Sequence, residues 1–348
     1  MKRRVLVGGV QVPFVTGGAE WHLAALVDRL RAAGVDAEAV QLPFQWSPRE
    51  AALRSALAWR LLDFEQASGH PVDLFIATRF PSYAARHPRK VCWLFHPFRQ
   101  AYDLHDAGVD GFPDTPEGRD LHEKVKALDG QALRECRRLY TTSETNARRL
   151  RRYQGLEAEV LRLPLLDPEG FSAQAYEGFA LSVGRLDSLK RTDLLVRAAR
   201  FLPERLRVVI AGDGPERPRL EALAREQGVA ARVELLGRVD DRRLRELYAR
   251  AGVVFYAPFD EDYGLVTLEA FHARKPVVTT TDAGGPLEFV VDGETGFVAP
   301  PEPEALGRAL LGALEDAERA REMGERGYRR VRGFSWDAVI AALTEGIA

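Results

Sequence analysis

Short apolar runs alternate with amphipathic stretches along both halves of this chain. A short apolar run bounded by turn residues is typical of a buried strand, whereas the amphipathic stretches repeat with the period of a helix. Because parallel strands need a crossover, usually a helix, the alternation predicts an α/β fold with two doubly wound, Rossmann-like parallel sheets. Ligands bind at the carboxyl ends of strands in such sheets, so we expect the main site in a cleft between two facing domains.

The pattern assigns elements to each half. Strands are predicted over Arg4–Val10, Asp73–Ala77, Lys90–Phe95, Arg138–Thr142, Val160–Leu163, Phe179–Val183, Arg207–Ala211, Arg232–Leu236, Val253–Ala257 and Pro276–Thr280. Helices are predicted over Gly18–Ala33, Thr145–Tyr153, Thr192–Leu202, Arg217–Gln227, Asp241–Ala251, Gly264–Arg274 and Pro286–Val291. Gly34 is expected to end the first helix, and Ser143 and Ser335 are each expected to cap a helix.

The length of the chain also favours two domains. A chain of 348 residues is too long for one ordinary core. The segment Leu166–Gly178 contains Pro168 and two glycines and has no clear period, so it is interpreted as a linker. We therefore predict an N-terminal domain over residues 1–168, a C-terminal domain over residues 178–332, and a final helix within residues 333–348.

Composition excludes several classes of protein. A net charge of −2 offers no global attraction for nucleic acid. Two cysteines, Cys92 and Cys136, argue against a disulfide framework. No apolar stretch approaches the roughly 20 residues of a spanning helix, and the apolar run after Met1 is too short for a signal peptide. We therefore expect a cytoplasmic protein.

The segment from Pro258 to Val298 is the most informative about function. It opens after an apolar run and places Glu261 and Tyr263 before Gly264, at the start of a predicted helix that carries Glu269. Free amides at a helix N-terminus hold phosphate, and a carboxylate deeper in a site accepts hydrogen bonds from sugar hydroxyls. The alternative interpretation is a pair of solvated acids on either side of an ordinary helix.

Other strand ends in the C-terminal half carry residues suited to a diphosphate. One strand runs into Gly184 and Arg185, with Lys190 five residues further on. The forked guanidinium of an arginine and the compact ammonium of a lysine together suit a diphosphate. The next strands run into Gly212-Asp213-Gly214-Pro215 and into Gly237-Arg238-Val239. The alternatives are surface charge near a helix start and ordinary tight turns.

Two strand ends in the N-terminal half are also candidates. Val15-Thr16-Gly17-Gly18-Ala19-Glu20 links a strand to a helix, and its two glycines permit close approach of a ligand to the backbone. His96 follows another strand, in the segment WLFHPFRQAYDL. A plain βα turn and a structural histidine are the alternatives.

These motifs together resemble glycosyltransferase family 4, whose members are retaining enzymes of the GT-B fold. The resemblance rests on E-x7-E (Glu261, Glu269), G-R-x4-K (Gly184, Arg185, Lys190), the Gly212–Gly214 turn and the strand-to-helix turn at Gly17–Gly18. The segment around His96 is similar to a His-Pro…Arg…Tyr-Asp stretch of some family 4 mannosyltransferases. Pro97 comes one residue early there, which leaves the acceptor side in question.

The resemblance implies a role for each residue. Glu269 would hold the ribose of the donor, and the amides of Gly264, Leu265 and Val266 would bind the diphosphate and sugar. Arg185 and Lys190 would stabilise the departing diphosphate, while Glu261 and His96 would position the donor sugar. The remaining predicted donor-binding residues are Gly17, Gly18, Gly184, Gly212, Gly214, Arg238, Val239 and Tyr263. The final helix would pack back on the N-terminal domain.

The implied activity is a retaining hexosyl transfer from a nucleotide diphosphate sugar. GDP-mannose is favoured, with a UDP-sugar as the alternative, and the acceptor is a hydroxyl of a glycan, a lipid-linked compound or a small molecule. No cofactor or metal is expected, because the D-x-D pattern at Asp260–Asp262 lies in GT-B surroundings. A basic cluster, Arg148, Arg149, Arg151 and Arg152, is either a solvated face or a contact to an anionic acceptor or membrane surface.

Three other functions share this architecture or these motifs. A nucleotide-sugar epimerase of the same architecture is the alternative enzyme. A phosphorylase would need a lysine-bound pyridoxal phosphate, and the chain has few lysines. A non-catalytic nucleotide-sugar-binding partner is the alternative of another class, against which the presence of Glu261, Lys190 and His96 argues.

Overall fold

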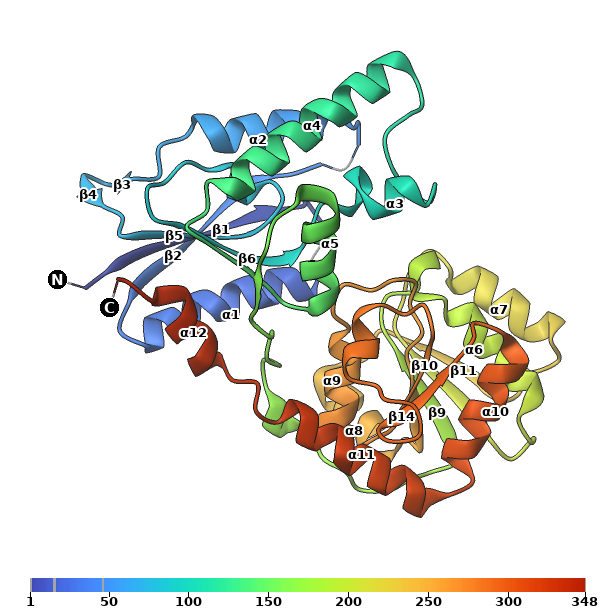
Figure 1. The fold of residues 1–348 in the computed structure, drawn as a ribbon. Coiled ribbons are helices and arrows are strands. Elements are labelled where there is room, and N and C mark those ends of the chain that lie inside the picture. Colours follow the sequence, from blue (N-terminus) through green and yellow to red (C-terminus); the bar gives the residue numbers. More distant parts are fainter. Residues whose placement is uncertain (1, 15–16, 46, 348) are drawn as a thin grey trace. The chain divides into compact units, whose positions relative to one another are not determined.

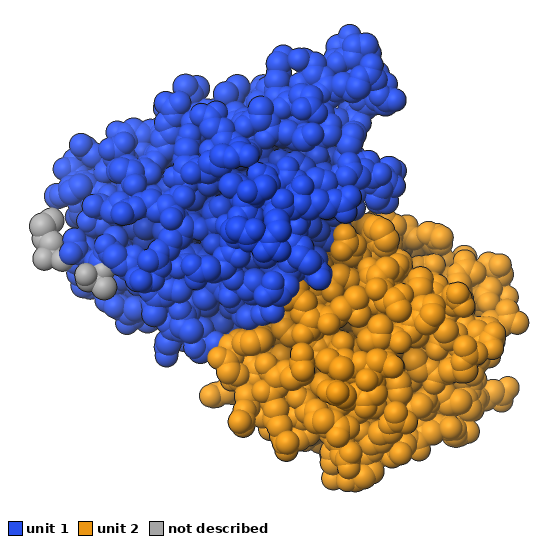
Figure 2. Space-filling model, viewed as in Figure 1, with its two compact units in different colours: residues 1–166, 335–348 blue, residues 167–334 orange. Residues whose placement is uncertain are grey.

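The protein consists of two compact units (Figure 2). The computed structural model describes residues 2–14, 17–45 and 47–347. The N-terminal unit contains the chain up to Leu166 and the segment from Ser335 onward, and the C-terminal unit is Asp167–Phe334. The last helix thus belongs to the N-terminal unit, although it follows the C-terminal unit in the sequence.

A six-stranded parallel sheet forms the centre of the N-terminal unit, with the strand order β2-β1-β5-β6-β7-β8. The strands are β1 (Arg4–Gln11), β2 (Asp36–Pro43), β5 (Leu74–Arg79), β6 (Lys90–His96), β7 (Arg138–Thr141) and β8 (Glu159–Val160), with a small antiparallel pair, β3 (Gln66–Ala67) and β4 (His70–Pro71). The helices are α1 (Gly18–Ala32), α2 (Glu50–Leu61), α3 (Asp103–Asp106), α4 (Pro116–Arg134), α5 (Glu144–Gln154) and α12 (Trp336–Thr344), with the 3-10 turns η1 (Ser82–Ala84) and η2 (Arg99–Ala101).

Helices cover both faces of this sheet, α2 and α4 on one and α1 and α12 on the other (Figure 1). The central strand β5 is therefore buried along its whole length, as parallel strands between two helical layers are. Ser335 caps helix α12, and its hydroxyl accepts a hydrogen bond from the amide of Ala338. Trp336 on this helix packs against Trp93 of β6, and its indole N–H donates to the carbonyl of Leu165.

The C-terminal unit repeats the architecture, with the strand order β11-β10-β9-β12-β13-β14, all parallel. The strands are β9 (Phe179–Val183), β10 (Arg207–Ala211), β11 (Val233–Gly237), β12 (Val253–Phe255), β13 (Val277–Thr280) and β14 (Gly296–Ala299). The helices are α6 (Thr192–Ala198), α7 (Arg217–Glu226), α8 (Asp241–Arg250), α9 (Leu265–His272), α10 (Pro303–Leu314) and α11 (Ala317–Val331), with the 3-10 turns η3 (Pro168–Gly170), η4 (Ser188–Lys190), η5 (Ala199–Phe201) and η6 (Gly285–Glu288).

The order of the strands creates a switch point between β9 and β12. From β9 the chain builds outward through β10 and β11, and it then returns to the other side of β9 to add β12, β13 and β14. Loops that follow two neighbouring strands diverge at such a point and leave a crevice for a ligand. Helices α6, α7 and α10 share a core on one face of the sheet, and α8, α9 and α11 lie on the other (Figure 1).

The predicted α/β class is confirmed, and most predicted elements are present within a few residues. Three predictions are wrong in detail. The helix predicted over Pro286–Val291 is only the 3-10 turn η6, because the backbone of Gly284 and Gly285 packs directly against the loop after β12. The strand predicted over Val160–Leu163 is the short pair Glu159–Val160, and the helix from Thr192 ends at Ala198. Elements β2, α2, α4, β14, α10 and α11 were not predicted.

The segment interpreted as a linker has little regular structure but is held to the C-terminal unit. Within Leu166–Gly178 only the turn η3 is helical. The amide of Gln174 donates to the carbonyl of Ala249, and the Tyr176 hydroxyl donates to the carbonyl of Arg274. Among the described residues, no helix is both long and apolar enough to cross a bilayer.

Candidate active site

Lys190 and Glu261 meet at the switch point of the C-terminal unit. Lys190 ends the turn that follows β9, and Glu261 lies in the loop that follows β12. The Lys190 ammonium donates a hydrogen bond to Glu261 Oε2. The Tyr256 hydroxyl donates to the same oxygen at 3.0 Å and lies 3.3 Å from Lys190 Nζ. Because β9 and β12 are neighbours, residues 71 positions apart form one cluster.

This cluster keeps a positive charge that solvent can still reach. The side chains of Lys190 and Glu261 are 28% and 19% exposed. Burial acts to lower the pKa of Lys190, but the Glu261 carboxylate outweighs it and holds the pKa above its usual value. Burial raises the pKa of Tyr256, and Glu261 raises it further. At neutral pH Lys190 is therefore a cation and Tyr256 a neutral donor, an arrangement that can bind an anionic oxygen.

Helix α9 begins beside this cluster, at Gly264. Gly264 has φ 89°, and a Cβ there would lie 2.9 Å from Pro286 Cγ and 3.1 Å from Tyr256 Cε1, so both its backbone and its surroundings require glycine. The amides of Leu265 and Val266 are in the first turn of α9, where no intrahelical acceptor exists. Such a helix start attracts an anion.

The side chain of Tyr263, another predicted donor-binding residue, is buried directly before this helix start. Its ring is buried edge-on against Phe289, at 5.5 Å between ring centroids. A Cβ on Gly285 would lie 2.7 Å from the backbone of Tyr263. Tyr263 is thus held by packing on both its ring and its backbone, and its place in the loop is set by the glycines opposite.

Glu269 lies one turn further along α9. Its Oε2 accepts a hydrogen bond from the Tyr248 hydroxyl of α8 at 2.6 Å. Burial raises the pKa of Glu269 to about 7, although the hydrogen bond from Tyr248 acts to lower it. A half-buried carboxyl that is already oriented by a tyrosine can accept hydrogen bonds from vicinal hydroxyls of a ligand.

The loops after β9 and β10 pack backbone against backbone. A Cβ on Gly212 would lie 1.8 Å from the carbonyl oxygen of Gly184, and one on Gly214 would lie 2.3 Å from that of Leu186. The predicted glycines therefore serve close packing of two strand-end loops. Arg185 extends from this packed pair toward solvent, with its side chain 66% exposed and Nε 4.0 Å from Asp187.

Arg238 and Val239 lie at the end of β11, just before α8. Arg238 is exposed and Val239 is half-buried. Asp240 follows them and caps α8 by accepting a hydrogen bond from the amide of Arg243 at 2.7 Å. The ends of β9, β10, β11 and β12 thus bring the predicted residues of this unit to one edge of the sheet.

The N-terminal unit contains the remaining predicted residues, Gly17, Gly18 and His96. Val15 and Thr16 of the same motif lie outside the described residues. Gly17 caps α1, and its amide donates to Glu20 Oε2 at 2.9 Å. Gly18 begins α1, with its carbonyl oxygen 2.6 Å from His22 Nδ1. His96 ends β6 and is half-buried, with Nδ1 3.1 Å from the carbonyl oxygen of Pro97.

The basic cluster on α5 is not one continuous face. Arg149 is buried and hydrogen-bonds Asn146, whereas Arg148 donates to the Thr145 hydroxyl. Arg151 pairs with Glu157, and Arg152 stacks over the Tyr153 ring at 5.0 Å. The sequence pattern of four arginines therefore overstates the positive surface that this helix offers.

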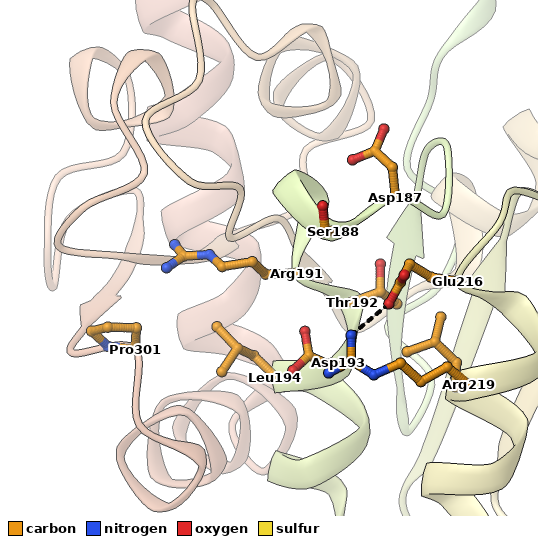
Figure 3. Close-up of a pocket in the computed structure, with 10 residues that line it drawn as sticks. Asp187, Ser188, Arg191, Thr192, Asp193, Leu194, Glu216, Arg219 and Pro301 are labelled. Carbon is orange, nitrogen blue, oxygen red and sulfur yellow. Dashed lines mark hydrogen bonds and ion pairs between the residues drawn. The ribbon is translucent and has the colours of Figure 1, made fainter. Parts of the chain in front are cut away.

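A cavity of about 420 Å³ lies beside η4 and the start of α6 (Figure 3). Asp187, Asp193 and Glu216 line it. Its two lining arginines are both paired, Arg219 with Glu216 at 2.8 Å and Arg191 with Asp282 at 2.7 Å. Among the described residues that line it, neither Lys190 nor Glu261 appears. Because the three carboxylates outnumber the two arginines, we place the candidate site at the Lys190–Glu261 cluster, next to the start of α9.

Sequence reasoning missed three side chains that organise the site. Tyr256 and Tyr248 orient Glu261 and Glu269, and Arg191 bonds Asp282 and the loops around it. The only signal for Arg191 was its position directly after Lys190. The tyrosines occur in ordinary strand and helix patterns, so nothing in the sequence distinguished them from core residues.

Comparison with solved structures identifies the architecture. Sucrose-phosphate synthase from Thermosynechococcus elongatus superposes with a TM-score of 0.78 at 20% identity, over 99% of this chain and 98% of that one. Anabaena HepE, solved in complex with UDP and glucose, superposes with a TM-score of 0.70 at 18% identity, over 99% and 98% of the two chains. The predicted GT-B fold is therefore confirmed.

Sequence comparison finds similarity to known glycosyltransferases. Residues 170–330 match the family described as glycosyl transferases group 1. D-inositol 3-phosphate glycosyltransferase of Nocardia farcinica is 32% identical over 264 residues, which are 68% of this chain and 56% of that protein. These two matches confirm the predicted resemblance to family 4. The chain spans about half the length of the curated relatives that it matches.

Proposed function

We propose that this protein is a retaining glycosyltransferase that moves a hexose from a nucleotide diphosphate sugar to an acceptor hydroxyl. The observation that carries the proposal is the Lys190–Glu261 cluster at the switch point, next to the start of α9. A diphosphate placed there would have the Lys190 ammonium and the amides of Leu265 and Val266 as donors. Glu269 would accept hydrogen bonds from the ribose.

In the proposed reaction the acceptor oxygen attacks the anomeric carbon from the side of the leaving group. The bond between that carbon and the phosphate oxygen breaks, and its electron pair goes to the diphosphate. The acceptor proton passes to a phosphate oxygen, so no separate protein base is needed. Lys190 stabilises the charge that develops on the diphosphate, and removal of one such donor typically costs about 3–4 kcal/mol. Arg185, whose side chain is 66% exposed, is the proposed second cation.

These cations and amides would stabilise the negative charge of the diphosphate, as a metal ion does in other transferases. We therefore propose that the transfer does not require a metal. Activity in excess EDTA should equal activity with added Mg²⁺. Loss of at least nine-tenths of the rate on chelation, with recovery on adding Mg²⁺, would contradict this part of the proposal.

The donor and acceptor are proposed at the level of class. The segment around His96 favours GDP-mannose, whereas the similar HepE structure contains UDP and glucose. The acceptor is a hydroxyl of a glycan, a lipid-linked compound or a small molecule, and the name of one relative points to an inositol phosphate. GDP-mannose, UDP-glucose, UDP-N-acetylglucosamine and ADP-glucose should be compared by release of nucleoside diphosphate, with and without inositol phosphate.

Lys190→Ala tests the assignment of the site. With the best donor we expect turnover to fall at least a hundredfold, because a cation that acts on the leaving diphosphate is lost. Lys124→Ala is the matched control, since Lys124 is an exposed lysine of α4 that pairs with Asp120 one turn before it. Both variants should retain the circular dichroism of the wild type. Near-normal turnover of the Lys190 variant would refute the site.

The product distinguishes the alternatives. NMR of the glycoside should show the anomeric configuration of the donor. An epimerised nucleotide sugar would indicate the epimerase, and tight nucleotide-sugar binding with no turnover on any acceptor would indicate a non-catalytic binding protein.

A further inference from the structure

Arg191 occupies a backbone conformation that favours glycine. It follows Lys190 directly, links the turn η4 to α6, and has φ 49° and ψ 39°. An L-residue is strained in this left-handed region, so a glycine would fit the backbone better. The contacts of the Arg191 side chain can offset this strain.

The Arg191 guanidinium binds both of the strand-end loops opposite it. Nε donates to the carbonyl of Ala257 at 3.0 Å, and Nη2 donates to that of Pro258 at 2.8 Å. In the loop after β13, Nη1 and Nη2 donate to the two carboxylate oxygens of Asp282 at 2.8 and 2.7 Å. Nη2 also reaches the hydroxyl of Thr280, the last residue of β13, at 2.8 Å. This fork ties the loop after β9 to those after β12 and β13.

The backbone around the fork carries both members of the catalytic cluster. The amide of Phe259 donates to the carbonyl of Leu189, directly before Lys190. The amides of Asp260 and Glu261 donate to the carbonyls of Asp282 and Ala283 at 2.9 and 2.8 Å. Lys190 is thus adjacent to the fork in sequence, and Glu261 is hydrogen-bonded to the segment that the fork holds.

We propose that Arg191 is a positioning residue that sets the distance and orientation of Lys190 relative to Glu261. The proposal rests on the proposed transfer reaction, because the effect of this positioning is greatest where charge develops on the leaving diphosphate. A lysine at this position would keep the charge but could not bind acceptors on two loops in one plane.

Arg191→Gly removes the fork and relieves the strain at the same time. Arg274→Gly is a matched control, because Arg274 also has a left-handed backbone, with φ 54°. Arg274 lies just before the start of β13, at the end of the strand opposite to the site, and its side chain pairs with Glu325. In a titration with donor, we expect Arg191→Gly to lower kcat at least tenfold, while KM for the donor changes less than threefold. In Arg274→Gly both constants should stay within twofold of the wild type.

Arg191→Lys separates the fork from the charge. We expect its kcat to stay at least fivefold below the wild type. Recovery of full kcat in this variant, a kcat of Arg191→Gly within twofold of the wild type, or a loss expressed only in KM would each overturn the proposal.

Hydrogen exchange tests the fork without any turnover. In Arg191→Gly the amides of Asp260 and Glu261 should exchange at least tenfold faster, whereas those of β9 and β10 should not change. Unchanged exchange at both amides would overturn the proposal. If the wild type itself transfers no sugar from any donor, the transferase proposal fails, and this measurement still decides on the fork.

Discussion

Glu269 and Lys275 both titrate near neutral pH, and in both the main cause is burial. Burial disfavours the charged form, so it raises the pKa of a carboxyl and lowers that of an amine. The two residues nevertheless have different consequences. Glu269 lies on α9 at the candidate site, whereas the Lys275 ammonium is buried beneath the segment that precedes β9.

Donor affinity should depend on pH through Glu269. Its pKa of about 7 means that the carboxyl is neutral below pH 7 and ionised above it. An ionised carboxylate is the stronger acceptor for ribose hydroxyls, so KM for the donor should fall as pH rises from 6 to 8. In Glu269→Gln, KM should be higher and independent of pH, with kcat little changed, since the ribose contact is similar in the ground and transition states. A large fall in kcat at unchanged KM would contradict the ribose role.

Lys275 should make the free energy of unfolding rise with pH. Burial, aided by Arg321, lowers its pKa from 10.5 to about 7. Between pH 7 and 10.5 the unfolded chain holds a proton that the folded protein lacks, so stability increases by at most about 1.4 kcal/mol per pH unit. The Tyr176 ring, 3.7 Å from Nζ, favours the cation and reduces this slope.

Urea unfolding of the wild type and Lys275→Met, followed by circular dichroism from pH 7 to 9, isolates this contribution. Groups other than Lys275 titrate alike in both proteins, so the difference between the two slopes belongs to Lys275. We expect the wild type to have the steeper slope. Parallel stability curves would show that the lysine keeps its proton when buried.

At the scale of elements, the start of α9 depends on Gly264. Gly264→Ala should destabilise the C-terminal unit by about 1–2 kcal/mol for the left-handed backbone and by a further 1–3 kcal/mol for overpacking against Pro286 and Tyr256. Gly293→Ala is the matched control, since Gly293 also has a positive φ, 73°, but a Cβ there meets nothing within 4 Å. Chemical denaturation should show the larger loss in the Gly264 variant. Equal losses would mean that the α9 start tolerates a side chain.

The sequence predicted those elements best that are buried on both faces. β9 and β10 have the predicted bounds, because a short apolar run bounded by turn residues is typical of a strand buried between two helical layers. β2 was missed because it is an edge strand with alternating polar residues, DAEAVQLP, and only its pairing with β1 makes it a strand. The helix expected at Pro286 failed because close contact between two loops, which no local pattern encodes, determines the backbone there.

The candidate site was predictable only to the level of individual loops. The sequence places Lys190 and Glu261 after separate strands, and the order of strands that makes β9 and β12 neighbours comes from the fold. Tyr256, Tyr248 and Arg191 contact residues of other elements, and these contacts form only when the strands and helices are packed side by side. The sequence alone could not predict them.

At the scale of the whole molecule, the N-terminal unit is built from two separate stretches of the chain. All five tryptophans of the sequence, at positions 21, 46, 59, 93 and 336, fall within the residue ranges of this unit. Tryptophan fluorescence therefore reports on the N-terminal unit, whereas circular dichroism reports on both.

Deletion of residues 335–348 should destabilise the N-terminal unit alone. The deletion removes α12, whose Trp336, Val339 and Leu343 are buried. Loss of one buried tryptophan typically costs about 3–5 kcal/mol, which lowers Tm by roughly 6–20 °C in a unit of this size. Trp336→Phe, which keeps the helix and the other four tryptophans, is the control and should lose less.

Thermal unfolding followed by both signals measures this effect. In the deletion variant the transition seen by tryptophan should move to lower temperature, while a dichroism transition of the C-terminal unit remains in place. A single transition that moves as a whole would show that the two units unfold together.

The return of the chain to its first unit also sets an order for its synthesis. The ribosome completes all strands of the first sheet before it begins the second unit, but helix α12 emerges only after Phe334. Until then the surface formed by Trp93, His22 and their neighbours lacks the ring of Trp336. The unit that is translated first is thus the last to be finished, and the newly made chain carries an uncovered aromatic face while the whole second unit is translated.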